Sequence, residues 1–225
     1  MGNIRFISLG DSALTVEFGN VISVELNDAA IALSNRLSQN PFPGFIESVP
    51  AYASTSIFFD ISVVRRNFPG FPDAFQAVSS IVDQALENLE TTASSPSRLV
   101  EIPVRFDPEA GPDLNIVAEQ AGLSRESVIE IFTGTIYRVF MLGFLPGFSY
   151  MGEVDGRIAM PRKNTPRAVV PKGSVGIAGK QTGIYSLASP GGWQIIGRTA
   201  VDMFTPDYES PCMLRPGDNV RFMPC

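Results

Sequence analysis

Two stretches in the first half of the chain carry apolar side chains at the spacing of an amphipathic helix. Val24–Leu37 follows Ser23, a residue type favoured just before a helix, and Pro41 lies where this pattern ends. Phe71–Leu89 repeats the spacing, with apolar residues on one side: Phe75, Val78, Ile81, Val82, Leu86 and Leu89. We therefore predict two helices that each bury one face.

Short apolar runs flank these helices and predict strands. The runs are Ile4–Ile7, Ala13–Phe18, Phe45–Val49, Thr55–Phe59 and Leu99–Val104. The resulting order, β-β-α-β-β-α-β, is compatible with a ferredoxin-like sandwich plus an extra strand. The polar stretch Thr91–Ser97 is typical of a linker. We therefore expect an α+β, ferredoxin-like N-terminal domain over residues 1–92.

Two short helices are expected after the linker, over Asp113–Ala121 and Arg125–Phe132. Asp113 and Ser124 are the expected N-caps, and Gly122 lies where a left-handed residue commonly ends a helix. A DNA-binding helix-turn-helix is the alternative. We favour packed helices, because acidic side chains along this segment would repel phosphate. The apolar positions that fit a core face are Ile116, Val117, Ile129 and Ile131.

From Tyr137 onward the helical periodicity disappears. Short β-branched or aromatic runs alternate there with Gly and Pro turns: YRVFML, RAVVP, SVGIA, TGIYS, WQIIG and NVRFM. This alternation is typical of an all-β barrel or sandwich. We therefore expect a second, all-β domain over residues 98–225.

The formal net charge of the 225-residue chain is −6, which argues against nucleic acid or an anionic membrane as its partner. No apolar run reaches the roughly 18 residues of a membrane span. The N-terminus lacks the pattern of a secretory signal. Cys212 and Cys225 indicate neither a disulfide framework nor a metal site. We therefore expect a cytoplasmic protein.

The chain contains no histidine. This absence excludes Ser-His-Asp and Cys-His catalysis within the chain, as well as His-ligated zinc and haem. Proton transfer would have to use carboxylates, Lys, Tyr, Cys, water or the residues of another chain. The sequence identifies no catalytic residue.

The segment Gly143–Gly152 (GFLPGFSYMG) concentrates apolar side chains around a Pro-Gly turn. It carries more apolar area than a solvated loop normally does. Two interpretations remain open at this point. Either the loop folds back onto its own core, or it forms a pocket wall or a contact with another subunit through Phe144, Pro146, Phe148 and Tyr150.

A stretch without any acidic residue runs from Arg157 to Val201 and carries a local charge of +7. It is rich in Gly and Pro, but its GSVGIAGKQTG segment does not match the nucleotide P-loop pattern. A rigid basic segment inside an acidic protein indicates a site for a small carboxylate or phosphate. The alternatives are a solvated basic face, or pairing with acidic residues of the first domain.

Several motifs taken together resemble the allophanate hydrolase subunit 1 family. They are Gly10-Asp11 with VEFG, then VPAY, GPDL, GFLPGFSYMG, the PR…TPR segment with VPKGSVGIAGKQTGIY, and SPGGWQIIGRT. The match is collinear over essentially the whole chain, and its last three blocks are highly specific. The resemblance implies that the second domain is a cyclophilin-like β-barrel.

The resemblance also implies a function. The chain would be a non-autonomous subunit of an ATP-dependent 5-oxoprolinase, which hydrolyses 5-oxoproline to glutamate. It would form a carboxyltransferase-like unit with the C subunit of 5-oxoprolinase, the A subunit would be a further partner, and ATP would bind to the assembled complex. The alternative within the family is a regulatory protein that inhibits a sensor histidine kinase. A peptidyl-prolyl isomerase would follow from the barrel alone, and fold is weak evidence for function.

The substrate of this family pairs a carboxylate with a cyclic amide, and the basic stretch offers groups for both. We predict that Arg162, Arg167 and Arg198 bind the carboxylate, that Gln181 matches the ring amide, and that Trp193 covers the ring. Each residue alone also has a structural interpretation, with Trp193 as core, Arg198 as a surface charge at a strand end and Gln181 as a turn residue.

Many members of the family carry a histidine where this chain has Phe132. A role that depends on this histidine therefore does not carry over to this chain.

Overall fold

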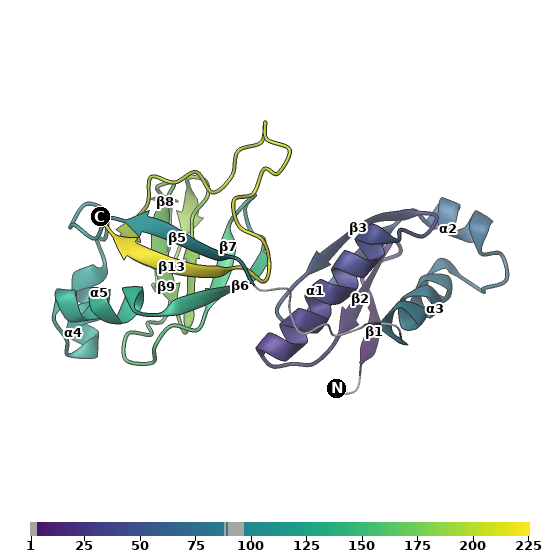
Figure 1. The fold of residues 1–225 in the computed structure, drawn as a ribbon, viewed down its shortest axis with the longest axis horizontal. Helices are drawn as coiled ribbons and strands as arrows, with labels where there is room; N and C mark the ends of the chain where they lie inside the picture. The colour runs from purple at the N-terminus through teal and green to yellow at the C-terminus, as the bar shows by residue number, and fades with distance from the viewer. Residues whose placement is uncertain (1–3, 88, 90–96) are drawn as a thin grey trace. The chain divides into compact units, whose positions relative to one another are not determined.

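The computed structural model describes residues 4–87, 89 and 97–225. The chain divides into two compact units, Met1–Pro96 and Ser97–Cys225, which Figure 1 shows as an α/β part and a β-rich part. The predicted linker Thr91–Ser97 lies outside the described residues, except for Ser97. The domain bounds 1–92 and 98–225 therefore stay predictions.

The first unit contains a four-stranded antiparallel sheet in the order β1-β2-β4-β3. The strands are β1 (Arg5–Ser8), β2 (Ala13–Glu17), β3 (Phe45–Pro50) and β4 (Ser54–Phe59). Helices α1 (Val24–Gln39) and α3 (Ala74–Glu87) pack against this sheet. Alternation along β2 and β4 turns every second side chain towards these helices, and the apolar ones are fully buried: Leu14, Val16, Ile57 and Phe59.

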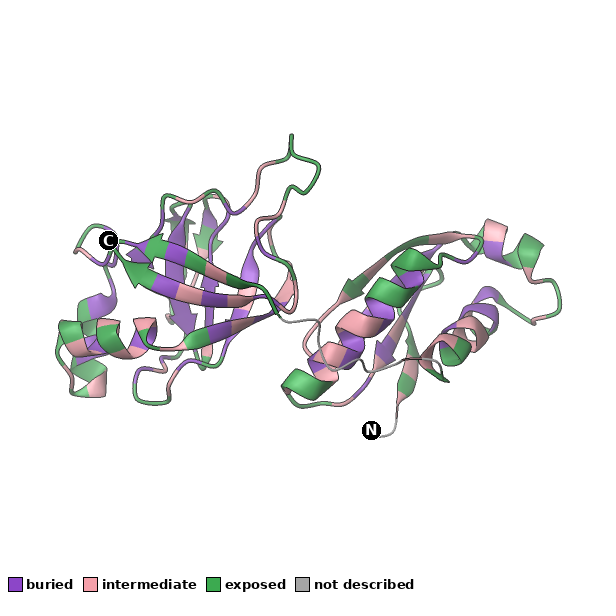
Figure 2. Cartoon of the chain, in the orientation of Figure 1, coloured by how far each residue is buried: buried purple, intermediate pink, exposed green. Residues whose placement is uncertain are grey.

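Helix α1 begins where the sequence predicts. Ser23 Oγ accepts a hydrogen bond from the Leu26 backbone N–H at 3.1 Å. Ala30 and Leu33 lie on the buried side, and Figure 2 shows exposed residues recurring along the other side of the helix. Val24, which the pattern placed on the apolar face, is exposed at the start of the helix. The predicted amphipathic helix is therefore confirmed apart from its first turn.

The hydrophobic pattern does not predict the short helix α2 (Ile61–Asn67). Asp60 caps it, with Oδ1 accepting the Val63 backbone N–H at 2.9 Å. Only Val64 is buried among its residues. Two turns with one buried position leave no periodicity to detect.

The strand β5 (Leu99–Val104) forms as predicted, but it joins the sheet of the second unit. The last strand of the β-β-α-β-β-α-β order is therefore not part of the first sheet. The ferredoxin-like description of the first unit stays a prediction.

The second unit is built on a seven-stranded sheet in the order β12-β9-β10-β7-β6-β13-β5. Besides β5, its strands are β6 (Ile136–Leu142), β7 (Ser149–Gly152), β9 (Ser174–Ala178), β10 (Gln181–Ile184), β12 (Gln194–Arg198) and β13 (Asn219–Pro224). Only β13 and β5 pair in parallel. A separate ribbon joins β8 (Arg167–Val170) to β11 (Ser189–Gly191).

A bridge brings the two ends of this sheet together. Arg105, the residue after β5, pairs with Arg198 at the end of β12, and each backbone N–H donates to the other carbonyl at 2.9 Å. Gly197 permits this approach, because a Cβ there would lie 2.6 Å from Val104 Cγ1. The sheet is thereby a nearly closed barrel, which confirms the predicted barrel class. Its cyclophilin-like description stays a prediction.

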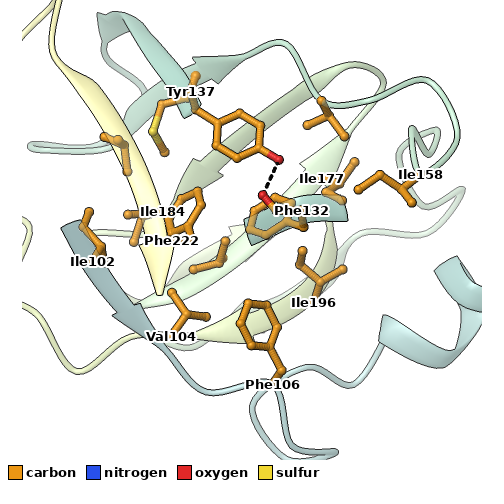
Figure 3. Packing of buried hydrophobic residues seen from close by; sticks show 14 of the residues in the cluster. Ile102, Val104, Phe106, Phe132, Tyr137, Ile158, Ile177, Ile184, Ile196 and Phe222 are labelled. Atoms are coloured by element: carbon orange, nitrogen blue, oxygen red, sulfur yellow. Dashed lines mark hydrogen bonds between the residues drawn. The ribbon is translucent and has the colours of Figure 1, made fainter. Parts of the chain in front are cut away.

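The barrel core includes residues from the helices α4 (Leu114–Ala121) and α5 (Arg125–Thr133). Phe132 of α5 stacks on Phe222 with the ring centroids 4.9 Å apart, and the Tyr137 hydroxyl donates to the Phe132 carbonyl oxygen at 2.9 Å (Figure 3). The predicted core position Ile116 is wrong, because its side chain is 43% exposed. Val117 is buried as predicted, and Ile129 and Ile131 of α5 are partly buried against the core. The fully buried residues of α5 are Val128 and Phe132, which lie one turn apart.

The parts of the chain that the structure describes contain no helix long and apolar enough to cross a membrane. The same residues contain no group of three or more Cys, Asp or Glu side chains arranged to hold a metal ion.

Candidate functional site

Two neighbouring glycines leave part of one face of the barrel sheet without side chains. Gly176 in β9 pairs with Gly183 in β10, and Gly183 pairs in turn with Tyr150 in β7. A Cβ on Gly183 would lie 3.0 Å from Phe148 Cζ and 3.1 Å from Trp193 Cζ3. A Cβ on Gly176 would lie 3.1 Å from Trp193 Cβ. Glycine at both positions therefore lets two aromatic rings lie directly against the strands.

Five aromatic side chains gather here, and we call them the aromatic cluster: Phe144, Phe148, Tyr150, Tyr185 and Trp193. Phe148 is at the centre, with ring centroids 4.8 Å from Tyr150, 5.2 Å from Tyr185 and 5.5 Å from Trp193, all edge-to-face. Phe148, Tyr185 and Trp193 are buried, whereas Tyr150 is partly exposed. The cluster therefore meets solvent at Tyr150 and at the exposed Phe144.

The loop before β7 contains two residues with left-handed backbone. Phe144 has a φ of 68° and Gly147 a φ of 74°. A Cβ on Gly147 would lie 2.7 Å from the Met203 carbonyl oxygen, so the position has no room for a side chain. The loop buries Phe148 and leaves Phe144 62% exposed. Part of the segment is thus core, and the contact proposed for Phe144 and Pro146 stays a prediction.

Arg162 borders the aromatic cluster. Its Cζ lies 6.0 Å from the Trp193 ring centroid, which is at the limit of the cation–π range. Burial raises the pKa of Tyr150, and the charge of Arg162 opposes that rise. Burial also raises the pKa of Tyr185, against a hydrogen bond with the Trp193 backbone and the charge of Arg162. Both phenols therefore stay protonated at neutral pH, next to a cation.

Asp113 ties the basic segment to the barrel. Its buried carboxylate accepts Arg167 Nη2 at 2.7 Å, Lys163 Nζ at 3.0 Å and the Ile195 backbone N–H at 2.7 Å. Burial would raise the pKa of Asp113, but the hydrogen bonds from Arg167, Ile195 and Lys163 outweigh it and lower that pKa. Asp113 is the N-cap residue of α4, as predicted, but its side chain makes no cap bond to the helix, because both oxygens are occupied elsewhere.

Most charges of the acid-free stretch have acidic partners. The ion pairs are Arg157–Asp155, Lys163–Asp113, Arg167–Asp113, Lys172–Asp202 and Lys180–Glu153. These acids lie outside the stretch in sequence, and all belong to the second unit. These five cations are therefore neutralised by carboxylates from outside the stretch but within the second unit, and not by the first domain. Arg162 and Arg198 form no ion pair with any residue that the structure describes.

Three of the predicted ligand-binding residues lie around the aromatic cluster. Trp193 belongs to it, and the charges of Arg162 and Arg167 both act on Tyr185. Gln181 begins β10, and alternation along the strand places it on the face of Gly183. Arg198 lies at the end of β12 away from Trp193 and lines a separate hollow. None of Arg162, Arg167, Gln181 and Trp193 lines that hollow. That these side chains bind a ligand stays a prediction.

Sequence analysis missed two buried polar residues near this cluster. The Tyr185 hydroxyl would lie 2.3 Å from a Cβ on Gly191, so this glycine admits the ring. Gln194 Nε2 donates to the Pro161 carbonyl at 3.0 Å. Gln194 Oε1 and Arg167 Nη1 are buried and have no hydrogen-bond partner among the described residues. The two missed residues, Tyr185 and Gln194, lie in apolar runs that predict strands, and such runs in sequence indicate only core.

Phe132 lies in the barrel core and not in the aromatic cluster. Its side chain has no exposed surface, and its ring contacts Phe106, Tyr137 and Phe222. The histidine expected there in many family members would therefore be enclosed by aromatic rings in this chain.

The family described as carboxyltransferase domain, subdomain C and D, matches residues 4–214. The chain belongs to this family. The B subunit of 5-oxoprolinase from Bacillus subtilis (strain 168) is 44% identical over 96% of this chain and 90% of its own length. The protein of the same name from Escherichia coli O157:H7 is 38% identical over 100% of this chain and 97% of its own length. The resemblance noted in the sequence is thereby confirmed.

The crystal structure of TTHA0988 has the same fold as this carboxyltransferase-domain chain. The two share 39% identity over 95% of this chain, with a TM-score of 0.81. This chain spans only 40% of the TTHA0988 chain. Every residue of the aromatic cluster falls within the range that the family match covers.

Proposed function

We propose that this chain is the B subunit of an ATP-dependent 5-oxoprolinase, which converts 5-oxoproline, ATP and water to glutamate, ADP and phosphate. The observation that carries the proposal is the identity of 44% and 38% to two proteins named as this subunit, over nearly the whole of each chain. The carboxyltransferase-domain family agrees with a role in a multi-subunit enzyme.

In this proposal the aromatic cluster and its border bind the substrate. Arg162 has no acidic partner among the described residues and lies beside Trp193 and Tyr150, so it is the first candidate for the substrate carboxylate. Arg167 is held by Asp113 and contributes its remaining Nη1 group. Gln181 offers an amide to the lactam, and Tyr150 offers a hydroxyl. The Trp193 ring lies next to the Arg162 guanidinium and helps to position it.

The remaining parts of the reaction are assigned to the assembly. The C subunit is the direct partner and contacts the loop that carries Phe144 and Pro146, and the assembly includes the A subunit. ATP binds to the assembled complex. The exposure of Phe144, at 62% in a backbone conformation that a bulky residue rarely adopts, supports a loop shaped for contact.

The first experiment reconstitutes the enzyme. The purified chain is assayed for release of glutamate and ADP from 5-oxoproline and ATP, alone and together with the A and C subunits of 5-oxoprolinase. We expect turnover only with all three proteins. Equal turnover by the chain alone contradicts the non-autonomous role. An inactive full assembly contradicts the enzyme role, and inhibition of sensor-kinase autophosphorylation would then test the regulatory alternative.

The second experiment tests the substrate site within the active assembly. Arg162→Lys keeps the charge and removes the planar fork, and we expect kcat/KM to fall by about ten- to a hundredfold. Arg167→Lys should act in the same direction. Arg157→Gln is the matched control, because Arg157 is an exposed arginine of the same stretch that pairs with its neighbour Asp155. If the two lysine variants assemble normally and match the control within twofold, the substrate site lies elsewhere.

A further inference from the structure

Arg105 and Arg198 face each other across the bridge that closes the barrel. Each backbone N–H donates to the other residue's carbonyl at 2.9 Å, so the two are a directly opposed antiparallel pair. The side chains of such a pair leave the sheet on the same face, with Cβ atoms about 5 Å apart. Like charges in this arrangement are unfavourable unless an anion lies between them.

The acidic groups nearby neutralise this pair only in part. Arg105 Nε donates to Asp107 Oδ2 at 2.9 Å, and Asp107 Oδ1 also accepts the backbone N–H groups of Glu109 and Ala110. Among the residues that the structure describes, the Arg198 side chain forms no ion pair or hydrogen bond. One guanidinium of the pair is therefore left without a counter-charge.

Lys172 is a third cation near Arg105 and Arg198. Arg105, Lys172 and Arg198 line a hollow of about 300 Å³ together with Thr199, Ala200, Val201 and Asp202. Lys172 Nζ lies 2.7 Å from Asp202 Oδ1. With Asp107 included, three cations therefore face two carboxylates, and the hollow keeps an excess positive charge.

Close backbone contacts hold this hollow in shape. The Thr199 N–H donates to the Gly173 carbonyl at 2.9 Å. Gly173 has a φ of +80°, and a Cβ there would lie 2.1 Å from the Thr199 carbonyl oxygen. Gly197 makes a similarly close approach to Val104 across the bridge. A fixed backbone reduces the entropy lost when a ligand binds.

We propose that the hollow between Arg105, Lys172 and Arg198 binds a phosphate group, either free or at the end of a small molecule. A tetrahedral dianion offers enough oxygens and charge for two guanidinium forks side by side, whereas a carboxylate offers two oxygens and a single charge. The lining side chains are largely exposed, so binding is weak and sensitive to salt. This site is separate from the aromatic cluster and does not depend on the proposed enzyme role.

The test follows the backbone and arginine Nε resonances of the ¹⁵N-labelled full chain by NMR, during titration with inorganic phosphate at constant ionic strength. We expect saturable shifts at Arg105, Arg198 and Thr199, with a dissociation constant in the millimolar range. Arg198→Gln should weaken binding at least tenfold. Arg221→Gln, which removes an exposed arginine paired with Glu101, is the matched control and should bind as the parent does.

Three further arms decide between explanations. Acetate at the same ionic strength should give no saturable shift at these residues, and an equal response would overturn the proposal. Adenosine monophosphate is the second ligand. If its affinity equals that of inorganic phosphate, the site recognises the phosphate group alone. If its affinity is higher, the site recognises the phosphate end of a larger molecule. Because the chain has no histidine, affinity should rise with the dianion fraction between about pH 6 and 8. Absence of saturable shifts, or identical shifts in Arg198→Gln, rejects the site.

Discussion

Asp113 and Arg167 lie 54 residues apart in sequence and are joined by a hydrogen bond of 2.7 Å between Oδ1 and Nη2. The same oxygen accepts Lys163, and the other oxygen accepts the backbone N–H of Ile195 in β12. One buried carboxylate therefore fixes the PR…TPR segment against the barrel. The position of Arg167 beside the aromatic cluster depends on this contact.

Asp113→Asn should destabilise the protein. It leaves Arg167 and Lys163, whose side chains are 28% and 24% exposed, without their shared counter-charge. Removing one partner of a fully buried ion pair lowers the free energy of unfolding by about 3–5 kcal/mol. Because these two cations are partly exposed, we expect a smaller decrease, of about 2–4 kcal/mol. Urea unfolding followed by Trp193 fluorescence measures it. Asp155→Asn is the control, because it removes an acid whose partner Arg157 is exposed, and its effect should be much smaller. Equal effects of the two variants would contradict the role of Asp113.

Stability should fall in acid partly through the same carboxylate. The pKa of Asp113 is lower in the folded protein than its ordinary value of 3.8, so its contribution is present above that value and is lost as the pH falls through the folded pKa. The pKa of Asp155 is also lowered, to about 2, by its hydrogen bonds with Arg157, but this pair is exposed to solvent and adds little to the loss. Unfolding measured from pH 5 to pH 2 should show a shallower decline in Asp113→Asn than in the parent. Parallel curves would show that Asp113 has the same pKa in both states.

Gly147→Val should destabilise the loop before β7. The new side chain would have to adopt a φ near 74° and would place its Cβ 2.7 Å from the Met203 carbonyl oxygen. Strain and overpacking together should cost about 2–4 kcal/mol. We expect the barrel to remain folded and binding to the C subunit to weaken, as measured by thermal unfolding and pull-down. Gly156→Ala is the control, since a Cβ there meets nothing within 4 Å. Unchanged capture of that partner would make the loop a core element only.

Phe144→Gly should separate stability from binding. Glycine adopts a left-handed conformation without strain, which should stabilise the loop. The substitution also removes the edge-to-face contact between the Phe144 and Phe148 rings, and this loss offsets the stabilisation. We therefore expect stability within about 1 kcal/mol of the parent and at least tenfold weaker binding to the C subunit. Ile136→Ala, at another exposed apolar residue of the barrel, is the control for binding. Affinity equal to that of the control would remove Phe144 from the interface.

Limited proteolysis should divide the chain between the two units. The segment Thr91–Ser97 is polar and contains a proline, so we expect cleavage there or nearby and a resistant fragment that begins close to residue 98. Mass spectrometry of the fragments locates the cut. Loss of the whole second half after the first cleavage would contradict two independent domains.

Sequence periodicity predicts the elements with repeated buried positions. Helices α1 and α3 and most barrel strands follow from it, and Ser23, Ser124 and Gly122 act as the predicted caps. Helix α2 is missed because it buries one residue. Strand β7 is missed because its motif was interpreted as a loop, although alternation sends Tyr150 and Met151 to opposite faces of the sheet.

The candidate site was only partly predictable. The cluster motifs were identified from their composition, and the structure brings Arg162 to Trp193 as expected for a shared site. The partner of Arg167 could not be identified, because Asp113 follows a Gly-Pro pair and looks like an ordinary helix cap. Local sequence also cannot show that Arg198 pairs with Arg105, which lies 93 residues earlier in the chain.

The parallel pairing of β13 with β5 has a consequence for how the barrel forms. Leu99 pairs with Asn219, and β13 also pairs with β6, so β13 joins β5 to β6 in the order of the sheet. Contacts between residues so distant along the chain are slow to form, because a long loop must close before they contribute any stability. The barrel should therefore fold late and cooperatively, and a nascent chain that lacks β13 should expose the apolar faces of β5 and β6 to chaperones.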